Sequence, residues 1–273
     1  MPDLAYNALT LDRATAHRAD PAWLATQRSR PDARVIAFHD GEIHDAPVTP
    51  DTEAVFLGLD GDTPVFAADI PEPHGPTRDL RAIFSTLDPA EAATLAYARG
   101  LLHWTRNQQF CGTCGGATQP TDGGHVRQCQ KCGKLLFPRI EPAIIVLVTW
   151  QDTCLLARHR NARSYSTLAG FVEIGENLET AVHREVHEEA GVRLASVHYQ
   201  ASQAWPFPSG LMIGYRAEAA SPDIQVDGSE LDEARWFTPA EVRAMGEHRT
   251  DSIEHHLITD WLARTPPRNG TPR

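Results

Sequence analysis

One stretch of the chain, GFVEIGENLETAVHREVHEEAGV at residues 170–192, constrains the fold and the chemistry more than any other. Asn177 suits the cap that begins a helix, and Gly191 suits the left-handed residue that often ends one. Between them, aliphatic residues recur every four positions, the spacing of a helix face that packs on a core: Val182, Val186 and Ala190. The stretch therefore predicts a helix with one buried face.

The same helix brings several carboxylates together. Glu185, Glu188 and Glu189 stand at i, i+3 and i+4, so they share one face and repel one another. Hard divalent cations such as magnesium prefer oxygen ligands, and a bound cation would relieve this repulsion. Arg184 could pair with Glu176 or another carboxylate and fix its orientation. The alternative is a solvated acidic helix face, which is what most charge runs are.

The order of these residues resembles the signature of the Nudix hydrolases, G-x5-E-x7-R-E-U-x-E-E-x-G-U, in which U is aliphatic. Every defined position is matched: Gly170, Glu176, Arg184, Glu185, Val186, Glu188, Glu189, Gly191 and Val192. The resemblance implies metal-dependent cleavage of a diphosphate linked to a nucleoside. It also implies a mixed-sheet α/β/α sandwich built around the glutamate helix.

Composition narrows the class of protein. The 273 residues are 41% hydrophobic, enough to bury real cores, and carry a formal net charge of -11. That charge argues against broad electrostatic binding of nucleic acid. The first twenty residues do not resemble a secretion signal, and the longest strongly apolar run, Ala143–Trp150, is far shorter than the ~20 residues that span a bilayer. We expect a soluble, cytoplasmic protein.

The chain divides into four regions. Residues 1–105 predict a smaller α+β domain, with strands near Arg34–His39, Ala54–Leu59 and Pro64–Ala68 and a helix near Pro89–Arg106. This region carries no chemical motif, and we interpret it as structural or dimerising. Residues 106–137 hold four of the five cysteines, 138–264 hold the Nudix stretch among predicted strands, and 265–273 predict a frayed tail.

The cysteines form two CxxC pairs, Cys111 with Cys114 and Cys129 with Cys132, separated by fourteen residues. Two such pairs predict a zinc ribbon, in which four thiolates close a tetrahedral site and leave no open position. We therefore expect structural zinc. A redox CxxC motif is the competing interpretation. Cys154 lies in an apolar predicted strand, and we expect its thiol to be buried in the core and inert.

A second motif follows the glutamate helix. Residues 202–210 read SQAWPFPSG and resemble the SQPWPFPxS element of the NADH pyrophosphatase (NudC-type) branch, with Ala204 for the first proline and Gly210 for the final serine. Trp205 and Phe207, each followed by a proline, predict a stiff aromatic loop able to stack a flat ring. The alternative is an ordinary aromatic surface loop.

The resemblance to this branch extends loosely over residues 1–105, which it implies to be an N-terminal NADH-pyrophosphatase-like domain. It also assigns residues. It implies catalysis by Glu189 as general base, with Glu188 next, supported by Glu185 and Arg184. Magnesium or manganese would be held by Ala169, through its carbonyl, and by the glutamates Glu185, Glu188, Glu189 and Glu230. Substrate contacts would come from Phe137, Gln203, Ala204, Trp205, Pro206, Phe207, Pro208, Ser209, Gly210 and, where the branch has a smaller residue, Glu254. The branch is usually homodimeric.

The expected activity is therefore hydrolysis of NADH or NAD+ to nicotinamide mononucleotide and AMP, with removal of NAD caps from RNA 5′ ends as a related activity. Two alternatives stay open. One is a Nudix hydrolase for another substrate, such as ADP-ribose or a diadenosine polyphosphate. The other is a non-catalytic Nudix sensor whose zinc ribbon contacts nucleic acid, which predicts binding without turnover.

Overall fold

The chain folds into two structural units, and each unit is built from segments that are separated in the sequence. The computed structural model describes residues 4–44, 48, 52–72, 75–226, 228, 230–246 and 249–265. We call residues 5–140 with 204–210 the N-terminal unit, and the described remainder from residue 141 onward, with Leu4, the C-terminal unit. The predicted tail beyond residue 265 lies outside the described residues.

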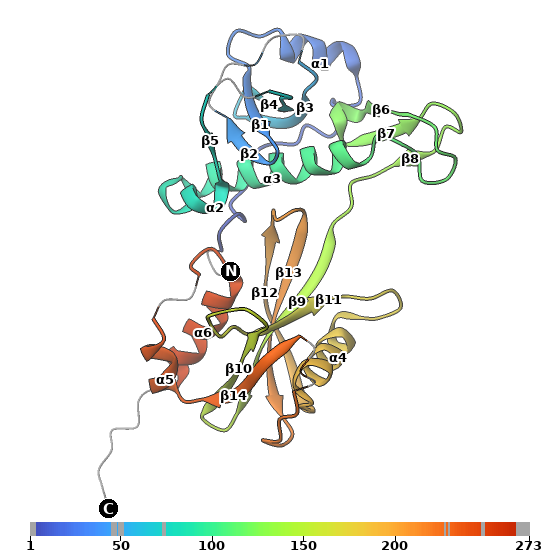
Figure 1. Ribbon diagram of the computed structural model, residues 1–273. Helices are drawn as coiled ribbons and strands as arrows, with labels where there is room; N and C mark the ends of the chain where they lie inside the picture. The colour runs from blue at the N-terminus through green and yellow to red at the C-terminus, as the bar shows by residue number, and fades with distance from the viewer. Residues whose placement is uncertain are drawn as a thin grey trace, which may run out of the picture. The chain divides into compact units, whose positions relative to one another are not determined.

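The C-terminal unit is built on a sheet in the order β12-β13-β9-β10-β14, with β11 paired to β9 (Figure 1). Its strands are β9 (Glu141–Trp150), β10 (Thr153–His159), β11 (Leu168–Phe171), β12 (Leu194–Trp205), β13 (Gly210–Ala219) and β14 (Leu231–Phe237). Its helices are α4 (Leu178–Ala190), α5 (Pro239–Ala244) and α6 (Ile253–Arg264).

Strand β9 is apolar on both faces, and this places a helix layer on each side of the sheet. Ile144 and Val146 pack in one cluster with Val182 and Val186 of α4. Alternate residues point to the opposite face of a strand, and Ile145 and Leu147 join a second cluster with residues of α5 and α6, which include Val242, Ile253, Leu257 and Trp261. The expected α/β/α sandwich is thus confirmed.

Helix α4 begins and ends as its sequence predicts. The Asn177 side chain accepts a hydrogen bond from Thr180 N at 2.8 Å, which satisfies a backbone donor of the first turn. Gly191 ends the helix in the left-handed region at φ 66°, where a Cβ atom would lie 2.8 Å from Gln225. These two ends fix which residues of α4 face the core and which carry the carboxylates.

The N-terminal unit contains a sheet in the order β3-β4-β1-β2-β5, in which β1 and β4 run parallel. Its strands are β1 (Arg34–His39), β2 (Glu42–His44), β3 (Val55–Asp60), β4 (Thr63–Asp69) and β5 (Thr77–Arg78). Its helices are α1 (Pro21–Arg28), α2 (Leu80–Ile83) and α3 (Pro89–Asn107), with a short 3-10 turn at Phe84–Thr86. Phe38, Leu57 and Val65 of the sheet pack against Leu95 and Leu102 of α3, which confirms an α+β domain.

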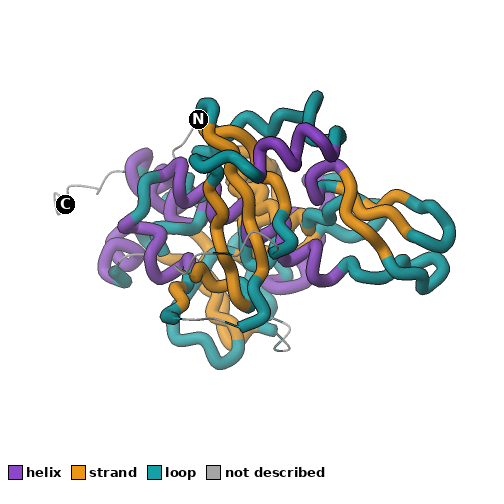
Figure 2. Tube along the Cα trace, turned by 90° about the horizontal axis from the view of Figure 1, so that it is seen from above, coloured by secondary structure: helices purple, strands orange, loops and turns teal. Residues whose placement is uncertain are grey.

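The cysteine region of this unit consists of short strands and loops (Figure 2). The strands β6 (Thr118–Thr121), β7 (Val126–Cys129) and β8 (Leu135–Leu136) form a three-stranded sheet. Two contacts tie it to the rest of the unit: His125 Nε2 lies 2.8 Å from the Phe56 carbonyl oxygen, and Arg18 pairs with Asp122 at 3.0 Å. In the described part of the chain, none of the helices combines the length and apolar character needed to cross a membrane.

Replacement of Val186 by alanine tests the packing of α4. Val186 is fully buried, and its shortening leaves a cavity between α4 and the sheet. We expect the free energy of unfolding to fall by about 2 kcal/mol, measured by urea denaturation. His183→Ala, on an exposed position of the same helix, serves as the control and should change it little. Equal stability of the two variants would contradict the packing described.

Candidate active site

Arg184 organises the acidic face of α4. Its Nε and Nη2 atoms donate to the two carboxylate oxygens of Glu176 at 2.6 and 2.9 Å, in a two-pronged ion pair. Its Nη1 donates to Glu185 and to Glu188, each at 2.9 Å, and Nη2 also donates to the Phe171 carbonyl oxygen at 2.9 Å. These bonds engage all five N–H donors of a guanidinium. Arg184 therefore joins the helix, strand β11 and the loop between them, as the sequence predicted for its pairing with Glu176.

Glu185 lies directly over Gly170. A Cβ atom built on Gly170 would stand 2.0 Å from the carboxylate carbon of Glu185, closer than any real contact. A side chain at this position would force the Glu185 carboxylate to move away from the backbone of β11. The arrangement brings Glu185 against the strand that carries Ala169, whose carbonyl the resemblance assigns to metal binding.

The charges around Arg184 shift one another's proton affinities. The bonds from Arg184, and after them the backbone N–H of Glu173, which donates at 3.0 Å, lower the pKa of Glu176 to about 2. Burial raises the pKa of Glu185 despite its bond to Arg184, and the charges of Glu188 and Glu230 act in the same direction. The site thus holds more negative charge than its single arginine neutralises.

The donor set fits a hard divalent cation. Glu189 is buried, with 5% of its surface exposed, whereas the side chain of Glu188 is 58% exposed and Glu230 is exposed. Carboxylate oxygens and a backbone carbonyl are the ligands that magnesium and manganese take in proteins. Arg184 Nη1 binds one oxygen of Glu185 and one oxygen of Glu188, and because a carboxylate has two acceptor oxygens, each can bind a cation through the other.

The four cysteines of the CxxC pairs converge as predicted. Their sulfur atoms all lie within 4.8 Å of one another, with Cys111 3.9 Å from Cys132 and Cys114 3.5 Å from Cys129. A tetrahedral zinc site with bonds of about 2.3 Å requires sulfurs about 3.8 Å apart. The Cys132 backbone N–H donates to Cys129 Sγ at 3.5 Å and contributes most to lowering the pKa of this thiol to about 6. The geometry supports a structural zinc ribbon.

The glycines after the two CxxC pairs and the fifth cysteine have the conformation and burial that the sequence predicts. Gly115 and Gly133 each follow a CxxC pair and adopt φ values of 69° and 73°, which favour glycine. Cys154 is fully buried in β10, and burial raises the pKa of its thiol to about 12. This thiol is therefore inert at neutral pH.

The aromatic motif belongs to the N-terminal unit, which the sequence did not indicate. Residues 204–210, which include the last two residues of β12 and the first of β13, group with residues 5–140. Trp205 and Phe207 are half-buried and pack against the core of that unit. Their rings contact each other edge to face, with centroids 5.4 Å apart. The loop with the aromatic motif thus belongs to the N-terminal unit, for which we expected a structural or dimerising role.

Two residues assigned to substrate have structural bonds. Gln203 is 1% exposed; its Nε2 donates to the Asp251 carbonyl oxygen at 2.8 Å, and its Oε1 accepts from Ile253 N at 2.7 Å. Glu254 Oε1 accepts from Thr167 N at 2.7 Å, one residue before β11 begins. Gln203 therefore holds the start of α6, and Glu254 ties that helix to β11. Substrate contact by either residue stays a prediction.

The remaining assigned residues are on the surface or along the loop. Phe137 is 59% exposed in the segment between β8 and β9, as a substrate contact requires. Ala204 is exposed, and its N–H donates to Asn7 Oδ1 at 2.8 Å. Pro208, Ser209 and Gly210 complete the turn into β13. The sequence missed the residues that hold this loop, because Asn7 lies almost two hundred positions away.

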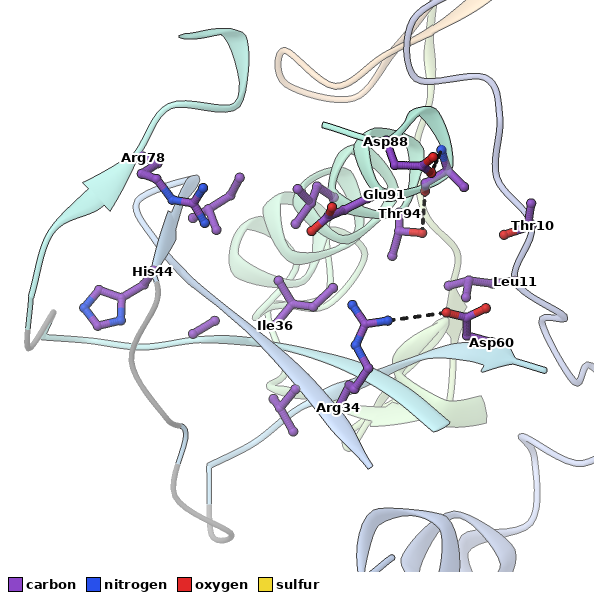
Figure 3. Close-up of a pocket in the computed structure, with 15 residues that line it drawn as sticks. Thr10, Leu11, Arg34, Ile36, His44, Asp60, Arg78, Asp88, Glu91 and Thr94 are labelled. Carbon is purple, nitrogen blue, oxygen red and sulfur yellow. Dashed lines mark hydrogen bonds and ion pairs between the residues drawn. The ribbon is translucent and has the colours of Figure 1, made fainter. Parts of the chain in front are cut away.

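A cavity of about 620 Å³ lies elsewhere, between the N-terminal sheet and the first turns of α3 (Figure 3). Its charged residues are largely engaged with one another or with backbone. Arg34 pairs with Asp60 at 3.4 Å, Asp88 caps α3 by accepting from Ala90 N, and Thr94 donates to the Ala90 carbonyl oxygen. The cavity contains none of the Nudix carboxylates, and its chemistry does not define a ligand.

Comparison with known families agrees with the geometry. The family model described as "NUDIX domain" matches residues 139–261, "NADH pyrophosphatase-like rudimentary NUDIX domain" matches 12–104, and "NADH pyrophosphatase zinc ribbon domain" matches 106–137. The match at residues 12–104 agrees with the N-terminal NADH-pyrophosphatase-like domain that the resemblance implied.

Individual relatives cover much of the chain. It is 39% identical over 241 residues to the NAD-capped RNA hydrolase NudC of Deinococcus radiodurans, covering 85% of each chain. It is 45% identical over 172 residues to the NAD-capped RNA hydrolase NudC of Pseudomonas aeruginosa, covering 62% of this chain and 61% of that protein. It is 40% identical over 201 residues to human NAD-capped RNA hydrolase NUDT12, covering 66% of this chain and 44% of that protein.

Replacement of Cys114 by serine tests the zinc site. Loss of one thiolate should release the metal and lower the midpoint of thermal unfolding by roughly 5 °C or more, since structural zinc contributes to folding. Zinc content by metal analysis and a melting curve measure both effects. Gly112→Ala, in the same turn but with no atom near the added methyl, should keep its zinc. A zinc-free Cys114→Ser protein that melts like the parent would refute a structural ribbon.

Acidification tests the ion pair between Arg184 and Glu176. The pKa of Glu176 falls from 4.5 to about 2 on folding, so ionised Glu176 stabilises the fold above pH 4.5. This contribution should be constant above that pH and disappear as the pH falls from about 4.5 towards 2. Urea denaturation of the parent and of Glu176→Gln across this range measures it as a difference that shrinks on acidification. A difference independent of pH would show that the pair does not form.

Proposed function

This chain belongs to the Nudix family, in the NADH pyrophosphatase branch, and we propose that it is a metal-dependent hydrolase of NADH and NAD+ that yields nicotinamide mononucleotide and AMP. The observation that carries the proposal is the ordered acidic face of α4, where Arg184 fixes Glu176, Glu185 and Glu188 beside Gly170. A solvated acidic face would need neither the five bonds of this arginine nor the close approach to the strand.

Magnesium or manganese would be held by Glu185, Glu188, Glu189 and Glu230, with the Ala169 carbonyl. When bound, such a cation neutralises charge that develops on the diphosphate and lowers the pKa of an attacking water. Glu189 is the proposed general base, which accepts the proton of that water at its carboxylate. Burial at 5% exposure shields Glu189 from bulk water and restricts its rotamers, as a positioned base requires. Arg184 keeps the neighbouring carboxylates oriented.

Substrate recognition falls to aromatic residues. Trp205 would stack on the nicotinamide or adenine ring, and exposed Phe137 would contact the substrate from the segment before β9. Phe137 offers no hydroxyl, Ala204 leaves its own φ free where the branch has proline, and Gly210 lacks a hydroxyl. These departures bear on substrate preference rather than on the reaction. The protein would act as a homodimer.

A second activity is favoured by one observation. The relatives that match most of this chain are NAD-capped RNA hydrolases. We propose that an RNA whose 5′ end carries NAD is also a substrate. With a net charge of -11, the chain has little general attraction for RNA, so recognition would rest on the cap, and cleavage should depend weakly on salt.

Product analysis tests the proposal against its alternatives. Equal amounts of NADH, NAD-capped RNA, ADP-ribose and a diadenosine polyphosphate are incubated with the protein and magnesium or manganese. We expect nicotinamide mononucleotide and AMP from NADH, and a 5′-monophosphate RNA from the capped RNA. Faster turnover of ADP-ribose or the polyphosphate would assign another Nudix substrate, and binding without any turnover would assign a sensor.

Glu189→Gln tests the assignment of the base. The amide removes a charged ligand and proton acceptor, so we expect kcat for NADH to fall by about 100-fold or more while the protein stays folded. Glu179→Gln makes the same change at an exposed position of the same helix and should keep the parent activity. If the two variants turned over NADH equally, Glu189 would have no part in the chemistry.

A further inference from the structure

The aromatic loop at residues 204–210 is anchored by residues of the N-terminal unit along its length. Ala204 N donates to Asn7 Oδ1 at 2.8 Å, and the Pro206 carbonyl oxygen accepts a hydrogen bond from Arg99 Nη1. Ser209 lies beside α3, where a Cβ added at Gly100 would stand 3.8 Å from the Ser209 Cβ, an ordinary van der Waals contact. The loop therefore depends on groups far from it in sequence.

Arg99 makes the most specific of these contacts. While Nη1 donates to Pro206, Nε donates to the Gly41 carbonyl oxygen at 2.9 Å in the turn between β1 and β2. The guanidinium also lies 4.9 Å from the centre of the Phe207 ring. One planar group thus bridges the sheet and the loop and contacts the aromatic side chain in between, a geometry that lysine cannot reproduce.

A second guanidinium shares the same ring. Arg81 lies 3.8 Å from the centre of Phe207 and 5.4 Å from that of Trp205. Two cations near one ring repel each other, and simple packing would be served better by aliphatic residues. The ring electrons and the two carbonyl oxygens bound by Arg99 offset that repulsion.

The contacts divide the aromatic pair into two roles. Phe207 is surrounded by Arg81, Arg99 and Tyr6, whose ring meets it edge-on at 5.9 Å. Trp205 contacts Phe207, with ring centroids 5.4 Å apart, and Arg81 lies 5.4 Å from the centre of the Trp205 ring. Phe207 is therefore the anchor of the loop, and Trp205 is the ring whose place that anchor sets.

We propose that Arg99 is a positioning residue for substrate binding: by holding Pro206 and Phe207 on the N-terminal unit, it fixes Trp205 for the substrate ring. The rudimentary Nudix domain thereby controls substrate affinity without supplying a group to the reaction. This inference rests on the proposed function, in which Trp205 stacks on the substrate.

Arg99→Met and Arg99→Lys test this role, with Arg106→Met as the matched control. Arg106 lies on the same helix and pairs with Asp69 and Asp40 rather than with residues 204–210. For Arg99→Met we expect KM for NADH to rise about tenfold or more, the scale of a lost charge-assisted hydrogen bond, with kcat within about threefold of the parent. The KM of Arg99→Lys should fall between those of the parent and Arg99→Met, and the KM of Arg106→Met should match that of the parent.

Hydrogen exchange supplies a readout that needs no turnover. The backbone amides of the non-proline residues within 204–210 should exchange at least about tenfold faster in Arg99→Met than in the parent or Arg106→Met, because local opening becomes easier. If Arg99→Met fails to fold, Arg99→Lys decides by the same two measurements. A parent-like KM with unchanged exchange, or a loss confined to kcat, would overturn the positioning role.

The two measurements separate this inference from the proposed function. A parent protein that does not cleave NADH would refute the function, and hydrogen exchange alone would then decide whether Arg99 anchors the loop. A parent that cleaves NADH, with an Arg99→Met variant of equal KM, would refute only the positioning role.

Discussion

The acidic face of α4 depends on one arginine. Carboxylates at i, i+3 and i+4 of a helix destabilise it unless something of opposite charge holds them. Arg184 does so with all five of its N–H donors, shared among Glu176, Glu185, Glu188 and the Phe171 carbonyl oxygen. Because that carbonyl belongs to β11, the same residue fixes the helix against the strand. A lysine, with three donors and no planar fork, could not make these contacts.

The charge left over gives the site its chemistry. One guanidinium cannot balance the glutamates that face it, and the raised pKa of Glu185 reflects both burial and its acidic neighbours. A divalent cation would complete the balance, and it would find carboxylates already oriented. Pre-orientation of this kind lowers the cost of assembling a metal site when substrate arrives. The close contact of Glu185 with Gly170 shows why a side chain at that strand position is incompatible with the arrangement.

Local patterns in the sequence predicted what is local in the structure. Asn177, Gly191 and the buried face with Val182 and Val186 follow from capping and a four-residue repeat, and the structure confirms all of them. The CxxC pairs predicted the cluster of sulfurs for the same reason. By contrast, nothing near Pro206 in the sequence indicates Arg99, and nothing near Thr167 indicates Glu254. Such contacts arise only when distant segments pack together, so a single sequence does not contain their signal.

Because long-range contacts cannot be read from the sequence, the sequence does not indicate that the N-terminal region holds the aromatic loop. It has no chemical motif of its own, yet it holds the loop that carries Trp205 and Phe207. Under the proposed function, this unit would act on substrate binding through packing and backbone hydrogen bonds, without a chemical motif of its own.

Crystals of the full chain soaked with manganese, measured at the manganese absorption edge, test the central claim most directly. The account predicts an anomalous peak bound by Glu185 and Glu189, with Glu176 still paired to Arg184. A peak elsewhere, or no peak at a manganese concentration that supports turnover while Glu185 and Glu188 remain on Arg184, would contradict it.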